Sequence, residues 1–393
     1  MKKKLDYMAE RTQYLFPEGA YSYLSLAGEM ESRGREIIHL EIGQPDFQTF
    51  DNISKAGIQA ISSGKTRYTS PAGITELREA IAHYLKERTG IPITSHQIVV
   101  GPGAKPLLFF PMMALLEPGD EVIYPDPGFP SYKSIIDIMG AEPVPIPLKE
   151  EKDFSFDMDV FFEKLTPRTR MVIINSPSNP TGGIIPEDDL ARIAEASLKY
   201  NFWVLSDEIY SRLSYGGETL KSIISFPGME DRTILVDGFS KTYAMTGWRL
   251  GYALMPELLA DKVELLLTHS VGCTASFTQL AGIEALKGPQ EQVDYYRSIF
   301  KKRRDFIVNG LNQISGISCR MPQGAFYVFP NVSSFGRKSE DLALHILNEA
   351  GVCLLPGTSF GQNGEGYLRL CYANSLEAIE KALEKIEEVL RKI

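Results

Sequence analysis

A lysine flanked by aromatic residues is the side chain of this sequence best suited to covalent chemistry. Lys241 follows a strand-like apolar run, and Phe239, Tyr243 and Trp248 lie within seven positions of it, with Arg249 eight positions later. An apolar wall and a neighbouring cation both lower the pKa of an amine, as Schiff-base formation with a carbonyl compound requires. Because a lone lysine after a strand is usually a solvated surface residue, this assignment depends on what else lies nearby.

Small, cyclic or functional residues follow five short apolar runs, at the points where the runs end. The runs cover residues 97–100, 121–124, 171–174, 202–205 and 233–236. Ligands of parallel α/β sheets bind beyond the carboxyl ends of the strands, so we expect the side chains after these runs to share one site. The candidates at these ends are Gly103, Ala104, Lys105, Phe129, Asn179, Asp207, Tyr210, Ser240 and Lys241.

Helical patterns alternate with these runs, which indicates how the candidates are positioned. Residues 76–89 place apolar side chains on one face, and residues 104–116, 131–139 and 187–200 are further helical candidates. Alternating strands and helices predict an α/β fold, with a mostly parallel sheet covered by helices on both faces.

The pattern changes towards the end of the chain, which indicates a second domain. Two long charged helices, near 290–313 and 376–392, flank shorter strands near 325–329 and 367–372. We expect a smaller α+β domain there, joined by the N-terminal segment. The predicted division is residues 1–50 for the N-terminal segment, 51–288 for the large cofactor-binding domain and 289–393 for the small domain.

The segment Ser-Lys-Thr-Tyr-Ala-Met-Thr-Gly-Trp-Arg-Leu-Gly-Tyr, residues 240–252, resembles the cofactor-lysine signature of class I/II aminotransferases. These belong to the fold-type I pyridoxal-phosphate enzymes, the aspartate aminotransferase superfamily. The other strand-end motifs match that family in order, so the resemblance covers nearly the whole chain. It implies ping-pong transfer of an amino group from an L-amino acid to a 2-oxo acid. The cofactor, pyridoxal 5'-phosphate, would be held as an aldimine on Lys241, which would also move the substrate α-proton.

The resemblance implies roles for four residues around the cofactor ring. Asp207 would face the pyridine nitrogen, because a carboxylate there keeps the ring protonated and electron-withdrawing. Tyr210 and Asn179 would bond the phenolic oxygen, and Phe129 would stack on the ring, which needs only a flat apolar face.

The cofactor phosphate requires backbone N–H groups at a helix start and cationic help. By the same resemblance, Gly103, Ala104 and Lys105 would offer those groups. Ser240 would add a hydroxyl and Arg249 a charge-assisted contact.

Two further positions affect the phosphate site. Gly238 stands where the family often has a serine, three residues before the lysine, and Ser240 is expected to substitute for it. Tyr68 resembles the tyrosine that reaches the phosphate of the neighbouring subunit, which implies a homodimer with shared active sites.

Arg369 resembles the arginine that binds the substrate α-carboxylate. It stands between apolar strand residues, where an unpaired charge is costly to bury, so an anionic partner is expected. Gly43 is similar to the glycine whose backbone N–H meets the same carboxylate. Asn179 and Phe129 would complete the substrate site.

Composition excludes several other classes of protein. A net charge of −9 argues against nucleic acid and anionic membranes as partners. The four cysteines form no CxxC pair and the five histidines no HxxxH pair, so neither a disulfide scaffold nor a metal site is expected. The N-terminal lysines precede no apolar stretch, and no run approaches 18 apolar residues. A cytoplasmic protein is therefore expected.

Two other functions and the substrate class stay open at this point. C–S lyases share the same constellation, and a noncatalytic aminotransferase-like sensor is a third possibility, although it needs an extra DNA-binding domain. A distal substrate carboxylate would need a cation, for which Lys65, Arg67 and Arg33 are weak candidates. The residues expected to line the specificity pocket favour neutral or aromatic side chains: Tyr21, Tyr23 and the 270–276 loop.

Overall fold

A computed structural model describes residues 9–15, 17–217 and 219–393. Within those residues the largest sheet has seven strands in the order β2-β8-β7-β6-β5-β3-β4. Only β8 runs antiparallel to its neighbours, so the other six strands share one direction. The strands are β2 (Ile98–Gly101), β3 (Glu121–Asp126), β4 (Glu142–Pro147), β5 (Thr169–Asn175), β6 (Trp203–Asp207), β7 (Thr233–Gly238) and β8 (Gly251–Leu254).

The five predicted strand runs all belong to this sheet, which confirms the α/β prediction. Two strands of this sheet, β4 and β8, were missed. β8 has four residues and follows the lysine segment without a turn signal. β4 contains Pro143, Pro145 and Pro147, which argue against a strand. The prolines are tolerated because β4 is an edge strand. Alternate N–H groups, including those of Glu142 and Leu148, point to β3, so the prolines lack only donors on the open side.

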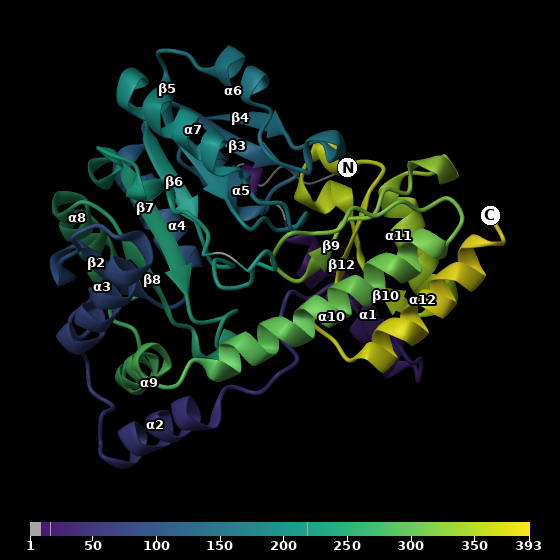
Figure 1. The fold of residues 1–393 in the computed structure, drawn as a ribbon, viewed down its shortest axis with the longest axis horizontal. Coiled ribbons are helices and arrows are strands. Elements are labelled where there is room, and N and C mark those ends of the chain that lie inside the picture. Colours follow the sequence, from purple (N-terminus) through teal and green to yellow (C-terminus); the bar gives the residue numbers. More distant parts are fainter. Residues whose placement is uncertain (1–8, 16, 218) are drawn as a thin grey trace.

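Helices cover both faces of the sheet (Figure 1). On one face α4 (Lys105–Leu115), α5 (Ser131–Ile138) and α8 (Glu257–Thr268) pack in one apolar cluster with the strands. The other face is covered by α3 (Thr75–Thr89) and α9 (Ser276–Lys287), and by α6 (Met158–Lys164) and α7 (Glu187–Tyr200). α2 (Asp51–Ser62) lies against α9. The helices predicted over 76–89, 104–116, 131–139 and 187–200 agree with the structure to within one residue at each end.

The C-terminal part forms a second group of elements, to which the long helix α10 (Glu291–Gln313) runs from beside α9 (Figure 1). It contains α11 (Ser339–Ala350), α12 (Leu376–Leu390) and a sheet in the order β11-β12-β9. These strands are short: β9 (Tyr327–Val328), β11 (Leu355–Pro356) and β12 (Leu368–Cys371).

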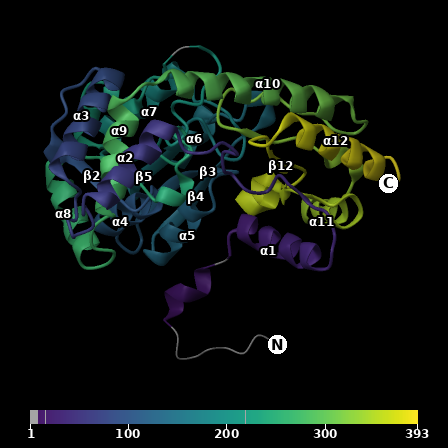
Figure 2. The same cartoon turned by 90° about the horizontal axis from the view of Figure 1, so that it is seen from below.

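The N-terminal segment packs with this second group. β1 (Ile38–His39) pairs in parallel with β10 (Val352–Cys353). Figure 2 shows α1 (Gly19–Ser32) on the side that carries α11 and α12, away from α3 and α8. The boundaries at residues 50 and 288 stay predictions. None of the helices in the described part of the chain combines the length and apolar composition that a membrane crossing requires.

Candidate active site

Lys241 lies just beyond the carboxyl end of β7. Its Nζ donates a hydrogen bond to the Gly43 carbonyl at 2.6 Å and lies 5.8 Å from the centre of the Phe326 ring. Burial of the amine is the main cause that lowers the pKa of Lys241 to about 8. The Cys371 thiol opposes this fall, and the positive charges of Arg249 and Arg369 add to it. About a tenth of such amines are neutral at pH 7, far more than for an ordinary lysine.

Asp207 ends β6 and is buried. The Tyr132 hydroxyl donates to its Oδ2 at 2.7 Å, and the Ile209 N–H donates to its Oδ1 at 3.2 Å. Burial nevertheless raises the pKa of Asp207 to about 6, and the neighbouring Glu208 adds to the rise. Among the described residues Asp207 has no ion-pair partner, and a buried carboxylate of this kind favours a cationic ligand group beside it.

Gly103, Ala104 and Arg249 form a cradle for an anion beside the start of α4. A Cβ on Gly103 would lie 2.2 Å from Arg249 Nη2, and a Cβ on Gly251 would lie 2.7 Å from the Ala104 nitrogen. Glycine at 103 and 251 therefore lets the loop and the guanidinium approach each other. Backbone N–H groups at a helix start and an arginine together suit a phosphate.

The structure gives a reason for glycine at position 238. Gly238, Gly251 and Gly101 are in register across β7, β8 and β2. A Cβ on Gly238 would lie 3.1 Å from the Gly251 Cα and 3.2 Å from the Ile209 Cδ1, so a serine there would be crowded. Ser240, which is expected to substitute for that serine, is buried, with 8% of its surface exposed.

Arg369 is 3% exposed, and its guanidinium carbon lies 4.6 Å from the Tyr327 ring centre and 5.0 Å from that of Phe360. Its Nη1 donates to Asn179 Oδ1 at 3.4 Å, and its Nη2 donates to the Glu41 carbonyl. The buried Nε has no hydrogen-bond partner among the described residues. A buried charge with an unused donor is suited to bind a carboxylate.

Tyr210 and Gly43 meet this site through Tyr327. The hydroxyls of Tyr210 and Tyr327 are 2.7 Å apart, and a Cβ on Gly43 would lie 2.0 Å from the Tyr327 hydroxyl. The 43 position therefore requires glycine, which brings its backbone close to both Tyr327 and Lys241.

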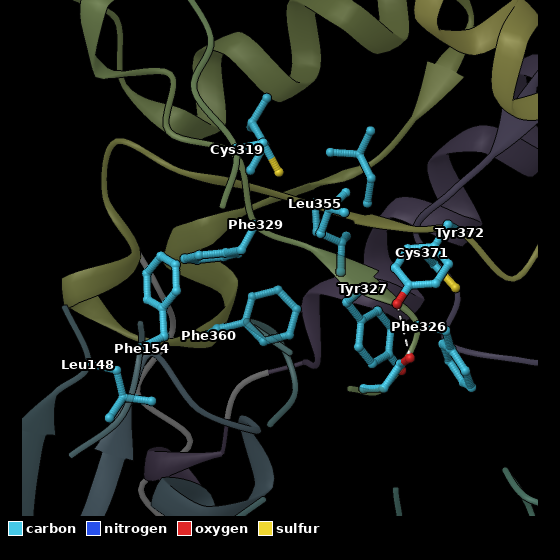
Figure 3. Close-up of a cluster of buried hydrophobic side chains, with 14 of the residues drawn as sticks. Leu148, Phe154, Cys319, Phe326, Tyr327, Phe329, Leu355, Phe360, Cys371 and Tyr372 are labelled. Atoms are coloured by element: carbon cyan, nitrogen blue, oxygen red, sulfur yellow. Dashed lines mark hydrogen bonds between the residues drawn. The ribbon is translucent and has the colours of Figure 1, made fainter. Parts of the chain in front are cut away.

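Sequence reasoning missed the aromatic wall of the site. Figure 3 shows Phe326, Tyr327 and Phe360 in one cluster of buried side chains. Tyr132, which bonds Asp207, was also missed. The available signals were the aromatic residues in the strand predicted at 325–329 and the helix predicted at 131–139, but neither pattern reveals a contact.

Of the remaining predicted residues, Phe129 lies beside Tyr132 and Lys105 lies beside Phe129, whereas Tyr68 lies elsewhere. Phe129 contacts Tyr132 edge-on, with ring centres 5.6 Å apart, and Lys105 Nζ lies 5.3 Å from the Phe129 ring centre. Tyr68 is separate from the cluster: it is 97% exposed on the loop between α2 and α3, which also carries Lys65 and Arg67.

The predicted specificity residues divide between several places. Tyr21 is 62% exposed near Lys105, whereas Tyr23 is buried in the core. Arg33 is exposed at the end of α1. The 270–276 loop lines an open hollow of about 920 Å³ beside Arg249.

Comparisons with known proteins show the family of this chain. The model of the family "Aminotransferase class I and II" matches residues 35–386. An aspartate aminotransferase of Pyrococcus horikoshii is 40% identical, covering 99% of this chain and 98% of the relative. Aromatic-amino-acid aminotransferase 2 of Thermococcus litoralis is 36% identical, covering 98% of each chain. The solved structure of aspartate aminotransferase from Thermus thermophilus with maleate has a TM-score of 0.92 at 34% identity, covering 97% of this chain and 99% of that one.

The chain therefore belongs to the class I and II aminotransferase family. It is a pyridoxal-phosphate-dependent aminotransferase with the fold-type I architecture.

Proposed function

We propose that Lys241 is the residue to which this aminotransferase attaches its cofactor. The observation that carries the proposal is the position of the Lys241 amine, which lies beyond the carboxyl end of β7 and donates to the Gly43 carbonyl. Burial there lowers the pKa of Lys241 to about 8. When bound, pyridoxal phosphate supplies a carbonyl group for attachment and a ring that withdraws electrons from the substrate α-carbon. Asp207 would hold its ring nitrogen, and the loop at Gly103 with Arg249 would hold its phosphate.

The donors around Lys241 fit that cofactor and an amino acid substrate. Arg369 and Asn179 would bind the substrate α-carboxylate, for which the Arg369 Nε, without a partner among the residues that the structure describes, is available. Phe129 would cover the ring face, and Tyr210 would bond the phenolic oxygen. Lys241 Nζ, once free, would take the proton from the substrate α-carbon, a general-base step within a ping-pong cycle.

Replacement of Lys241 tests this proposal. Lys241→Ala removes both the attachment point and the base, so we expect turnover to fall below detection. Added cofactor should give no absorption band of a lysine adduct. Lys302→Ala, on the exposed face of α10, is the matched control and should keep both activity and spectrum. Appreciable transamination by Lys241→Ala would contradict the assignment.

We also propose a homodimer with shared active sites. The exposed Tyr68 suits insertion into a second copy, and the hollow beside Arg249 is large enough to receive an aromatic side chain. Exposed apolar residues on α2, Ile58 and Ile61, favour a protein interface nearby.

The substrates, domains and location complete the proposal. Substrates are an L-amino acid and a 2-oxo acid, and residues 51–288 form the cofactor-binding domain. The four free cysteines favour a reducing compartment, the cytoplasm. No observation favours the C–S lyase alternative, and the relatives named above are aminotransferases.

A further inference from the structure

The Glu18 carboxylate links the N-terminal segment to the first residues of two helices, α4 and α5, that cover the large sheet. Glu18, the residue before α1, accepts hydrogen bonds at Oε1 from Lys105 Nζ and, at 2.9 Å, from the Ser131 hydroxyl. Lys105 begins α4 and Ser131 begins α5. The Glu18 side chain is 23% exposed and the Lys105 side chain 46%, so both remain accessible to solvent.

The pair also lies beside Phe129, the residue proposed to cover the cofactor ring. Lys105 Nζ is 5.3 Å from the Phe129 ring centre and 5.8 Å from the Tyr21 ring centre. Its charge is close enough to Lys241 to contribute to the lowered pKa of that amine. The Lys105 ammonium group is therefore bordered by two aromatic rings and is already paired with the Glu18 carboxylate.

We propose that Glu18 sets the substrate class of this aminotransferase by neutralising Lys105. This inference rests on the proposed function. The site then takes amino acids with uncharged side chains, aromatic ones above all, in preference to dicarboxylic amino acids. A distal carboxylate would have to compete with Glu18 for Lys105 and would be repelled by the Glu18 carboxylate. An aromatic side chain packs on Phe129 and Tyr21 and leaves the ion pair in place.

Glu18→Gln is the decisive variant, because it keeps the size of the side chain and an oxygen for Ser131 but removes the charge. We expect the ratio of kcat/KM for L-aspartate to kcat/KM for L-phenylalanine to rise about 10-fold. The double variant Glu18→Gln/Lys105→Met should lose that gain, because the freed cation is what attracts the second carboxylate. Glu29→Gln removes the same charge from an exposed position of α1 and should leave the ratio unchanged.

A binding measurement separates this inference from the proposed function. Calorimetry on the holoenzyme would compare glutarate, a dicarboxylate, with 3-phenylpropanoate, a monocarboxylate of aromatic shape. In Glu18→Gln glutarate should bind about 10-fold more tightly, whereas 3-phenylpropanoate binding should not change. This readout needs no turnover, so an enzyme that transaminates nothing would overturn the proposed function alone. A wild type that favours L-aspartate over L-phenylalanine, or a variant with unchanged ratio and glutarate affinity, would overturn the role of Glu18.

Discussion

The two arginines beside Lys241 are held in opposite ways. Arg249 is exposed, has a left-handed backbone at φ 53°, and donates to the Thr246 carbonyl at 2.9 Å and the Pro102 carbonyl at 3.4 Å. Arg369 is 3% exposed between two aromatic rings, and its Nε has no hydrogen-bond partner in the described part of the chain. The guanidinium of Arg249 is positioned by two backbone carbonyls, whereas that of Arg369 is positioned by one backbone carbonyl together with buried side chains that exclude water.

This difference fits two kinds of anion. A phosphate that stays bound can be held by many weak contacts, because backbone N–H groups and a solvated arginine share the charge. A substrate carboxylate comes and goes, so its affinity has to come from few contacts, and burial makes each of them stronger. The comparison predicts that Arg369 mainly affects kcat/KM for the substrate, whereas Arg249 mainly affects the dissociation constant of the cofactor.

Removing the buried charge should have the largest effect. In Arg369→Gln we expect kcat/KM to fall about 100-fold to 1000-fold, because a buried charge pair is lost. Cofactor affinity should change little. Arg369→Lys keeps the charge without the planar fork and should recover only part of the loss. Steady-state kinetics with saturating cofactor measures this, and full activity in Arg369→Lys would show that the geometry of the guanidinium is unimportant.

Removing the exposed charge should have a smaller effect on a different quantity. In Arg249→Gln we expect the dissociation constant of pyridoxal phosphate to rise about 10-fold to 100-fold, the cost of one charged hydrogen bond. The KM for the amino acid at saturating cofactor should stay within about twofold of wild type. Fluorescence titration of the apoenzyme gives the first value. A KM that rises more than the cofactor dissociation constant would remove the distinction between the two arginines.

The two arginine substitutions should have their smallest effect on the pH dependence of cofactor capture. Only the neutral amine attacks a carbonyl, so cofactor capture by the apoenzyme should rise about 10-fold per pH unit below pH 8 and level off above it. This follows from the Lys241 pKa of about 8. Both arginines lower that pKa, so Arg249→Gln and Arg369→Gln should each move the profile to higher pH, Arg249→Gln further. Growth of the absorption band between pH 6 and 10 measures this, and a wild-type midpoint near that of a free lysine would refute it.

The sequence predicted the part of the site that depends on strand direction. Lys241, Asp207 and Asn179 follow parallel strands, and parallel strands bring their ends to one edge whatever the loops do. The α/β fold followed from the same alternation. The family resemblance then supplied roles that residue type alone leaves open, such as that of Arg369.

Contacts between distant segments could not be predicted in this way. Tyr327 meets Tyr210 across 117 positions, and Glu18 meets Lys105 across 87. Neither pair shares a local pattern, because a helical or strand period specifies which face is buried but not which residue it meets. β4 was missed for a different reason: its prolines argue against a strand unless its place at the edge is known.

Those prolines also affect how molecules of this protein meet each other. The open side of β4 offers carbonyls but lacks N–H groups at Pro143, Pro145 and Pro147. A strand from another molecule would find acceptors there without the donors that a continued ladder needs, so edge-to-edge growth of the sheet is blocked. The edge of the sheet thereby resists aggregation without help from charged side chains, and association is left to other surfaces.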